Sequence, residues 1–366
     1  MNPSYMEQAL DLARQGLGRT SPNPAVGAVL VKDGAVIGAG FHTWAGVDHA
    51  EIVALKEAGD RARGADAYIT LEPCSHQGRT GPCAEALINA GIARVLVAME
   101  DPNPRVRGAG LKRLREAGIE VTLANEFADA AFKLNEAFVH FMNHQRPLVM
   151  LKAAVTLDGK IAAPEDNEGW ITSEKARGHV QELRHASDAI LTGIGTVSAD
   201  DCLLTDRTGR ERSRPLLRIV LDSQLRLSLT SKMVESCRED LLVVTTSAAS
   251  AQRRKALEQR GVKVIVCDGK DGRTDPRGAI EYLAREQYLS LMIEAGSKVN
   301  WTVLEAGLVD KIFFYYAPKI LGGMQSLPVA GGLGRRRRKD AIRFRDVRLH
   351  PISPNEFAVE AWARKE

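Results

Sequence analysis

The sequence is poor in the features that define several classes of protein. Its 366 residues include five cysteines, too few for the disulfide framework of a secreted chain, so we expect a reducing compartment. No run approaches the roughly 20 apolar residues that cross a bilayer, and residues 1–20 lack the basic start and apolar core of a signal peptide. With 50 Lys and Arg against 46 Asp and Glu, the net charge of +4 is a weak argument for a polyanionic partner. We therefore expect a soluble, cytoplasmic protein.

The chain instead contains alternating helix and strand patterns. Two apolar runs, at residues 26–31 and 35–41, flank an Asp33-Gly34 pair, which is a strong signal for a β-hairpin. From there strand and helix patterns alternate, and the last of them predicts one helix over residues 126–143. A hairpin followed by such an alternation predicts a mixed sheet covered by helices on both faces.

A domain boundary is expected near Pro147. Proline ends the preceding helix, and a new strand pattern begins at Leu148. The length also favours two domains, which we place at residues 1–145 and 146–366. The second domain again alternates, with strands expected at 148–155, 189–192, 217–222, 241–245, 262–267, 290–294, 311–316 and 357–362.

The most informative constellation is His49-Ala50-Glu51 followed by Cys74 and Cys83. One imidazole and two thiolates are good zinc ligands and leave a fourth position for water. Zinc-dependent base deaminases carry His-x-Glu followed by Pro-Cys-x-x-Cys, and here eight residues rather than two separate the cysteines. We therefore expect His49, Cys74 and Cys83 to bind zinc. Glu51 would take a proton from water and return it to a leaving amine. The alternative is two buried thiols and a helix-start histidine without a metal.

Motifs in both halves resemble those of one family, the bifunctional pyrimidine deaminase/reductases of riboflavin biosynthesis. Collinearity over so much of the chain is more specific than any single motif. The matching segments are Pro22–Gly27, His49–Glu51, Glu72–Thr80, Asp101–Pro104, Leu151–Lys152, Leu157–Gly159, Trp170–Ser173, Leu191–Gly193, Asp200–Asp201, Glu294–Gly296 and Ala317–Gly322. Two positions depart from the family pattern, because Cys202 and Gly81 stand where proline is usual. Neither departure removes a ligand or an ionisable group.

The resemblance implies two folds and two activities. The first domain would be a cytidine-deaminase-like three-layer α/β/α sandwich that uses zinc to hydrolyse the 2-amino group of a diaminopyrimidinone ribosylamino phosphate. The second would be a dihydrofolate-reductase-like α/β domain that reduces the ribosyl group to ribityl with NADPH. The expected partner is thus a small phosphorylated pyrimidine. We also expect a homo-oligomer, a dimer or a tetramer, with neither nucleic acid nor membrane as a partner.

The resemblance also implies binding residues for each ligand. For the pyrimidine or its phosphate they are Asn23, His42, His76, Arg79 and Asn103. For NADPH they are Ala154, Trp170, Thr196, Asp200, Ser223 and the turn formed by Gly296, Ser297, Lys298, Val299, Asn300, Trp301 and Thr302. For the substrate of the reductase they are Glu168, Arg184, Leu204, Arg207 and Glu294.

Elementary chemistry supports part of this assignment. Asn23 is held stiffly between two prolines and offers both a donor and an acceptor to a base edge. The guanidinium forks of Arg184 and Arg207 suit a phosphate. Reduction at the sugar C1 needs an opened ring and a proton for the ring oxygen, for which Lys152 and Asp200 are the candidate partners.

Two helix starts are candidates for binding the pyrophosphate of the hydride donor. One is Gly193–Thr196 and the other is Glu294–Lys298, and each follows a strand-like run. Neither carries the full dinucleotide fingerprint. The residues alone leave both open, and only the resemblance favours the second.

A run of five cations, Arg335–Lys339, follows a glycine-rich stretch. Because no aromatic residue lies inside the run to stack on bases, a solvated loop is favoured over a nucleic-acid patch. Two alternatives to the bifunctional enzyme remain. One is a nucleic-acid base deaminase that binds RNA through this run. The other is a structural zinc module, for which His42 and His76 are the candidate fourth ligands.

Overall fold

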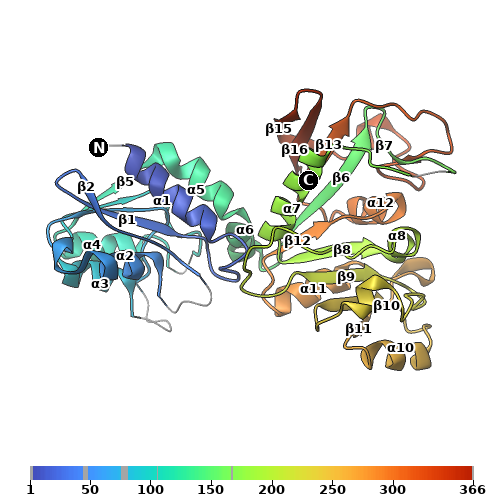
Figure 1. The fold of residues 1–366 in the computed structure, drawn as a ribbon, viewed down its shortest axis with the longest axis horizontal. Coiled ribbons are helices and arrows are strands. Elements are labelled where there is room, and N and C mark those ends of the chain that lie inside the picture. Colours follow the sequence, from blue (N-terminus) through green and yellow to red (C-terminus); the bar gives the residue numbers. More distant parts are fainter. Residues whose placement is uncertain (1–2, 44–47, 76–80, 105, 166–167, 365–366) are drawn as a thin grey trace. The chain divides into compact units, whose positions relative to one another are not determined.

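The computed structural model describes residues 3–43, 48–75, 81–104, 106–165 and 168–364. The chain divides into two compact units, drawn in Figure 1. The first comprises Met1–Gln145 with Glu211–Arg214, and the second comprises Arg146–Arg210 with Pro215–Glu366. The short segment 211–214, which the sequence analysis places in the second domain, thus groups with the first unit. In the described part of the chain no helix is long and apolar enough to span a membrane.

The first unit is built on a five-stranded mixed sheet of order β2-β1-β3-β4-β5. Its strands are β1 (Gly27–Lys32), β2 (Ala35–Phe41), β3 (Asp66–Ile69), β4 (Arg94–Val97) and β5 (Glu120–Leu123). β1 pairs antiparallel with β2 and β3, whereas β3, β4 and β5 run parallel. The β1–β2 hairpin turns at Asp33 and Gly34, whose φ angles of 51° and 78° are left-handed, as a tight two-residue turn requires. The expected hairpin is confirmed.

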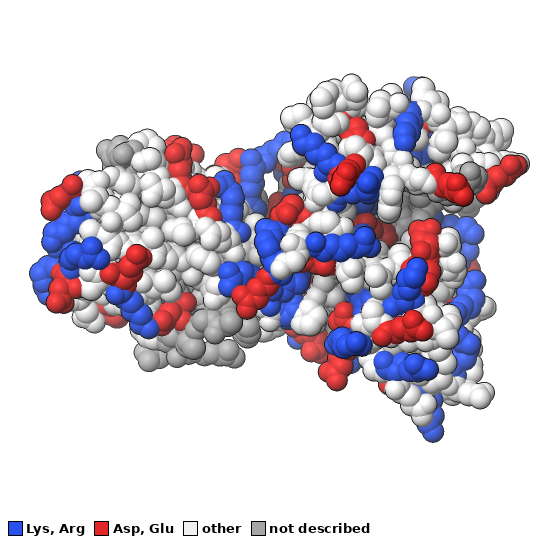
Figure 2. Space-filling model, viewed as in Figure 1, with Lys and Arg blue, Asp and Glu red and all other residues white. Residues whose placement is uncertain are grey.

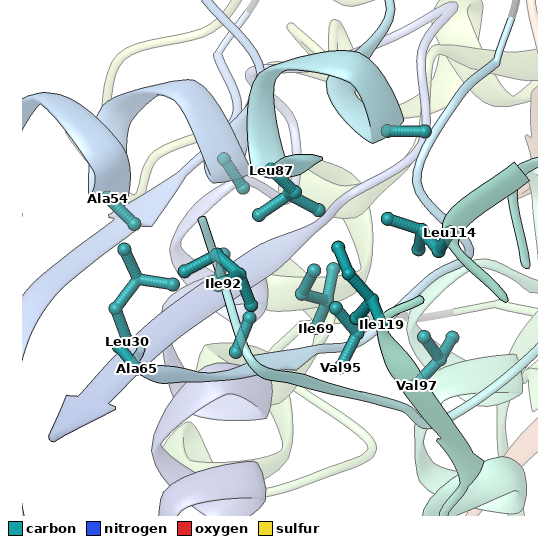
Figure 3. Close-up of a cluster of buried hydrophobic side chains, with 14 of the residues drawn as sticks. Leu30, Ala54, Ala65, Ile69, Leu87, Ile92, Val95, Val97, Leu114 and Ile119 are labelled. Carbon is teal, nitrogen blue, oxygen red and sulfur yellow. The ribbon is translucent and has the colours of Figure 1, made fainter. Parts of the chain in front are cut away.

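Helices cover both faces of this sheet (Figure 1). One face carries α1 (Pro3–Gln15) and α5 (Ala128–Leu134), and the other carries α2 (Ala50–Ala58), α3 (Cys83–Ala90) and α4 (Ala109–Glu116). Successive strand residues alternate between the two cores, so that Leu30 packs with α2 and α3 while Val29 packs with α1. Figure 3 shows Leu30, Leu87 and Leu114 within the core on the side of α2, α3 and α4. The expected three-layer α/β/α sandwich is confirmed.

Helix α2 lies close to the hairpin because β2 carries a glycine at the contact. A Cβ at Gly38 would lie only 2.2 Å from the Ala54 carbonyl oxygen. Any larger residue would push α2 away from the sheet. This close packing holds α2, whose N-cap is His49 and whose first turn contains Glu51, against the sheet.

The second unit contains a nine-stranded sheet of order β11-β10-β9-β8-β12-β6-β13-β16-β15. Its strands are β6 (Leu148–Thr156), β8 (Ala189–Gly193), β9 (Leu217–Leu221), β10 (Leu241–Thr245), β11 (Lys263–Val266), β12 (Ser290–Ile293), β13 (Lys311–Ala317), β15 (Phe344–Ser353) and β16 (Glu356–Ala363). The first seven in sheet order are parallel to one another, and β16 pairs antiparallel with both β13 and β15. A separate ribbon pairs β7 (Lys160–Ala162) with β14 (Leu327–Pro328).

The helices of the second unit connect these strands and cover the sheet. They are α7 (Glu174–Ala186), α8 (Ile194–Asp200), α9 (Lys232–Glu235), α10 (Ala251–Glu258), α11 (Arg277–Arg285) and α12 (Ser297–Glu305). Because the carboxyl ends of parallel strands meet at one edge of a sheet, the helix starts that follow β8 and β12 lie beside each other there.

Several details differ from the sequence-based expectation, since the short elements β7, β14 and α9 were not expected. The prediction of one helix over residues 126–143 is wrong, because α5 ends at Leu134 and a separate helix, α6 (Glu136–His144), follows. The cause is Asn135, whose side-chain amide bonds both the N–H and the carbonyl of Ala25 at 2.8 and 2.9 Å. Strand β15 was not expected, since most of its residues are exposed and it contains Pro351, which is tolerated at a sheet edge.

Candidate active sites

The three expected zinc ligands converge in the first unit. His49 is the N-cap of α2, Cys74 follows β3, and Cys83 is the first residue of α3. Their ligand atoms all lie within 4.8 Å of one another. His49 Nδ1 is 3.6 Å from Cys74 Sγ and 3.2 Å from Cys83 Sγ. An imidazole and two sulfurs converging on one point fit a zinc ion with an open fourth position.

Without a metal ion, the electrostatics of this cluster lower the pKa of Cys74 and raise that of Cys83, because the Cys83 thiol donates a hydrogen bond to the Cys74 sulfur. A hydrogen bond from the Cys83 thiol lowers the pKa of Cys74 to about 4, although burial acts in the opposite direction. Cys74 Sγ also accepts the Cys83 backbone N–H at 3.3 Å, at the positive end of α3. The pair thus favours one thiolate, at Cys74, and Cys83 would release its proton when it binds a metal.

Glu51 lies in the first turn of α2 and is 4% exposed. Burial raises the pKa of its carboxyl to about 7. Its side chain also interacts with that of Cys83, so it lies against the metal cluster. A carboxyl in this position and environment is suited to take up and release a proton near neutral pH.

Two of the expected pyrimidine-binding residues lie beside the cluster. Asn23 Nδ2 is 3.0 Å from His42 Nε2, and His42 Nδ1 is 3.1 Å from the Asp48 carbonyl oxygen. The rings of His42 and His49 meet edge to face with 5.1 Å between their centroids. Burial lowers the pKa of His42, which favours a neutral ring able to bind a base edge.

The remaining expected residues of this site are placed less completely. Asn103 belongs to the segment after β4, where its backbone N–H donates to Asp101 Oδ1 at 2.8 Å. His76 and Arg79 lie outside the described residues. Sequence reasoning quoted Glu72 in a motif but gave it no role, whereas the structure buries it and surrounds it with backbone N–H donors.

In the second unit, three of the expected residues form one buried ion network. Glu294 Oε2 lies 3.1 Å from Lys152 Nζ, and Glu294 Oε1 lies 2.7 Å from Arg184 Nε. Each of the three side chains is 11–12% exposed. Burial by itself would raise the pKa of Glu294, but Lys152 and Arg184 outweigh it and lower the pKa to about 2. The network thus holds one carboxylate between two cations.

Helix α7 binds the loop that carries Arg207. Arg184 Nη1 donates to Thr205 O at 3.0 Å, and Gln181 Oε1 accepts the Arg207 N–H at 2.9 Å. His185 Nδ1 lies 2.7 Å from Asp206 Oδ2. Gln181, Arg184 and His185 share one helix face by their i, i+3, i+4 spacing. Sequence reasoning missed Gln181, His185 and Asp206, although that spacing beside a chosen arginine is a usable signal.

The two candidate pyrophosphate turns lie side by side. Gly193 is the N-cap of α8 and Gly296 the N-cap of α12, after the neighbouring parallel strands β8 and β12. A Cβ added at Gly296 would lie 3.6 Å from Thr196 Oγ1. The alternatives that the sequence left open are therefore adjacent helix starts at the carboxyl edge of the sheet.

The other residues of the implied cofactor turn are mostly occupied by packing. Ser297 Oγ donates to Pro328 O at 2.5 Å, and Asn300 Nδ2 donates to Val329 O at 2.8 Å. Val299, Trp301 and Thr302 continue α12, and Thr302 Oγ1 donates to Lys298 O at 2.9 Å. These bonds fix the first turns of α12, so that its backbone rather than these side chains is available to a ligand.

The remaining expected residues are spread around this edge. Ala154 lies on β6, Asp200 ends α8, and Glu168 lies in the exposed loop before Trp170. Trp170 is 69% exposed, with Arg177 4.9 Å from its ring centroid.

Two of the expected residues have side chains that face away from the ion network. Ser223 follows β9, two strands from β12, and its hydroxyl accepts the Thr274 N–H. The side chain of Leu204 belongs to the hydrophobic core, so a substrate contact there would come from its backbone.

The cationic run Arg335–Lys339 is exposed, as the solvated-loop interpretation expects. Arg335 lies 5.7 Å from the ring centroid of Trp301, and Arg337 pairs with Asp340 at 2.6 Å. On the face shown in Figure 2, acidic and basic side chains are interspersed over each unit, in keeping with the nearly balanced composition.

Two family models match the chain. Residues 2–99 match the cytidine and deoxycytidylate deaminase zinc-binding region, and residues 147–355 match the RibD C-terminal domain. The fold of the first unit and its His-Cys-Cys cluster define a zinc-dependent deaminase of the cytidine deaminase class, followed by a reductase domain.

Relatives match both units at once. The chain is 41% identical over 343 residues to riboflavin biosynthesis protein RibD of Actinobacillus pleuropneumoniae, which covers 93% of this chain and 90% of that protein. It is 40% identical to RibD of Escherichia coli K12, with 96% of each chain covered. Among solved structures, Acinetobacter baumannii RibD superposes with a TM-score of 0.85 at 37% identity, covering 99% of this chain and 98% of that one. The chain belongs to the RibD family of riboflavin biosynthesis.

Proposed function

We propose that the chain carries out two successive reactions of riboflavin biosynthesis. A Thermotoga maritima protein is described as a diaminohydroxyphosphoribosylaminopyrimidine deaminase and 5-amino-6-(5-phosphoribosylamino)uracil reductase. Its structure matches with a TM-score of 0.82 at 35% identity over 99% of this chain and 98% of that one. The observation that carries the proposal is the convergence of His49, Cys74 and Cys83 on buried Glu51, in a chain that also holds the Glu294 ion network.

The first reaction is a hydrolytic deamination. His49, Cys74 and Cys83 would hold zinc, which when bound acidifies a water and makes it a nucleophile. Glu51 takes a proton from the attacking water and passes it to the leaving amine, so that a C–O bond forms, a C–N bond breaks and ammonia departs. Asn23 and His42 would orient the pyrimidine beside this group, and His76, Arg79 and Asn103 would complete its binding.

The second reaction reduces the ribosyl group to ribityl. NADPH, when bound, supplies a hydride to the sugar C1. Lys152 would give a proton to the ring oxygen as the C1–O bond opens, with Glu294 holding its ammonium group in place. Asp200, whose pKa is raised by burial, is the other candidate donor. Arg184 and Arg207 would bind the phosphate end of the substrate.

The wider setting of the enzyme is also part of the proposal. We infer a cytoplasmic homo-oligomer, a dimer or a tetramer, whose partner is a small phosphorylated pyrimidine rather than nucleic acid. Light scattering of the purified protein measures the oligomeric state. A salt-sensitive complex with RNA would contradict the assignment of the partner.

The test is NADPH oxidation after addition of the diaminopyrimidinone substrate to the zinc-loaded protein. We expect oxidation to follow ammonia release, because only the deaminated product is a substrate for the second site. Release of ammonia without any oxidation of NADPH would contradict the proposed reductase activity. RNA deamination without NADPH oxidation would favour the nucleic-acid alternative.

A further inference from the structure

Glu72 is a buried carboxylate in the segment that follows β3. It is 5% exposed and lies two residues before Cys74. A buried carboxylate is costly unless its oxygens are hydrogen-bonded. No cation pairs with it among the described residues, so its partners must be the neutral groups around it.

Those partners are backbone N–H groups of a single segment. Glu72 Oε2 accepts from the N–H of Asp101 at 3.0 Å and of Gly108 at 2.9 Å. Glu72 Oε1 accepts from the N–H of Gly110 at 2.9 Å and of Leu111 at 3.4 Å. One side chain therefore binds both ends of the segment 101–111.

The sequence of α4 explains why this carboxylate is needed. Its N-cap, Gly108, has no side chain, and no side chain of the helix caps its first turn. The free N–H groups at a helix start must find acceptors, and Glu72 supplies one from another part of the chain. Gly110 permits the approach, since a Cβ there would lie 2.0 Å from the Pro73 carbonyl oxygen.

We propose that Glu72 is a positioning residue that fixes the segment carrying Asn103 against the segment after β3 that carries Cys74. Through it the pyrimidine-binding loop and the metal ligand keep one relative placement, so that the base is presented to Glu51 in a constant orientation. The inference rests on the proposed deaminase function. It concerns residue positions and adds no group to the chemistry.

The test compares Glu72→Gln with a matched control, Glu85→Gln. Glu85 also holds α4, through Arg113 at 2.6 Å, but the side chains of Arg113 and Glu85 are 41% and 39% exposed. In Glu72→Gln one accepting oxygen becomes an N–H₂ group that faces donors. We expect its deaminase KM to rise about 10-fold or more at saturating zinc. Glu85→Gln should stay within about 2-fold of wild type.

Reduction of the already deaminated substrate provides the internal standard. It should be unchanged in both variants, because the Glu294 network lies in the other unit. Glu72→Asp retains the charge on a shorter side chain, and we expect it to recover part of the lost affinity. A purely structural role would lower the melting temperature without moving KM of the folded enzyme. Wild-type KM in Glu72→Gln would therefore overturn the inference.

Amide exchange of the wild-type holoenzyme tests the contact even if Glu72→Gln does not fold. The N–H groups of Gly108 and Gly110 should exchange as slowly as those inside α4, although they precede its first closed turn. Rapid exchange there would also overturn the inference. If wild-type protein does not deaminate the pyrimidine while these amides are protected, the proposed function fails. The hydrogen bonds of Glu72 to segment 101–111 then stand as a structural contact.

Discussion

The two units build their sites in different ways. In the first unit, the metal cluster comes from His49, Cys74 and Cys83, which lie close in the sequence and at the starts of helices or the end of a strand. In the second, Lys152 and Arg184 meet Glu294 from 142 and 110 positions away. A site of clustered ligands can depend on a metal for its charge balance, whereas the ion network pairs its carboxylate with cations of the protein itself. The first should thus fail by losing a ligand and the second by losing a partner.

The largest expected effect separates the two sites by metal. In Cys83→Ser a hydroxyl replaces a zinc ligand, and a weaker ligand at a three-ligand site lowers metal affinity. We expect the variant to lose bound zinc and deamination while reducing the deaminated intermediate at the wild-type rate. Metal analysis and the two activity assays measure this. Retained deamination without metal would remove zinc from the proposal.

A second variant separates the metal from the proton transfer within the first site. Glu51→Gln keeps the volume of the side chain but removes the base, so kcat for deamination should fall by about 10²- to 10⁴-fold. Zinc content should stay at the wild-type value. Full turnover in this variant would exclude Glu51 as the group that carries the proton.

The third prediction breaks the network of the second unit. Glu294→Gln leaves Lys152 and Arg184 buried without their carboxylate, which costs about 3–5 kcal/mol when one partner of a buried pair is removed. Denaturant unfolding of the second unit measures this loss, and the reductase activity should fall with it. The control is Glu182→Gln, since Glu182 is 56% exposed beside Arg210 and should cost at most about 1 kcal/mol.

The same variant has a defined pH dependence. Because the pKa of Glu294 is lowered to about 2, its contribution to stability is present above the unfolded value near 4.3. It is lost as pH falls from about 4 toward 2, where the unfolded chain binds the proton first. The stability difference between wild type and Glu294→Gln should therefore shrink over this range. A difference that stays constant down to pH 2 would contradict the lowered pKa.

The contrast also explains what sequence reasoning could reach. Cys74, Cys83 and His49 are rare residue types in a short interval, and they predict a metal site before any fold is known. The partnership of Lys152 with Glu294 depends on β6 lying next to β12, which pairing, not local pattern, determines. Arg184 and Glu294 came from the family resemblance, and their joint charge balance came only with the structure. The helix break at Asn135 could not be predicted from local pattern, because the hydrogen-bond partner of Asn135, Ala25, is 110 residues away.

The smallest expected effect tests how the second unit holds its substrate loop. Gln181 is uncharged, and its Oε1 accepts the Arg207 N–H of the loop at 2.9 Å. In Gln181→Ala that exposed N–H is left to water, so the loss should be about 0.5–1.5 kcal/mol. We expect the reductase KM for the phosphorylated substrate to rise about 2- to 10-fold with kcat unchanged, because Lys152 and Glu294 are untouched. The control variant Lys175→Ala, at an exposed position of α7, should leave KM alone. A fall in kcat with constant KM would mean that the loop acts on the reaction itself rather than on substrate binding.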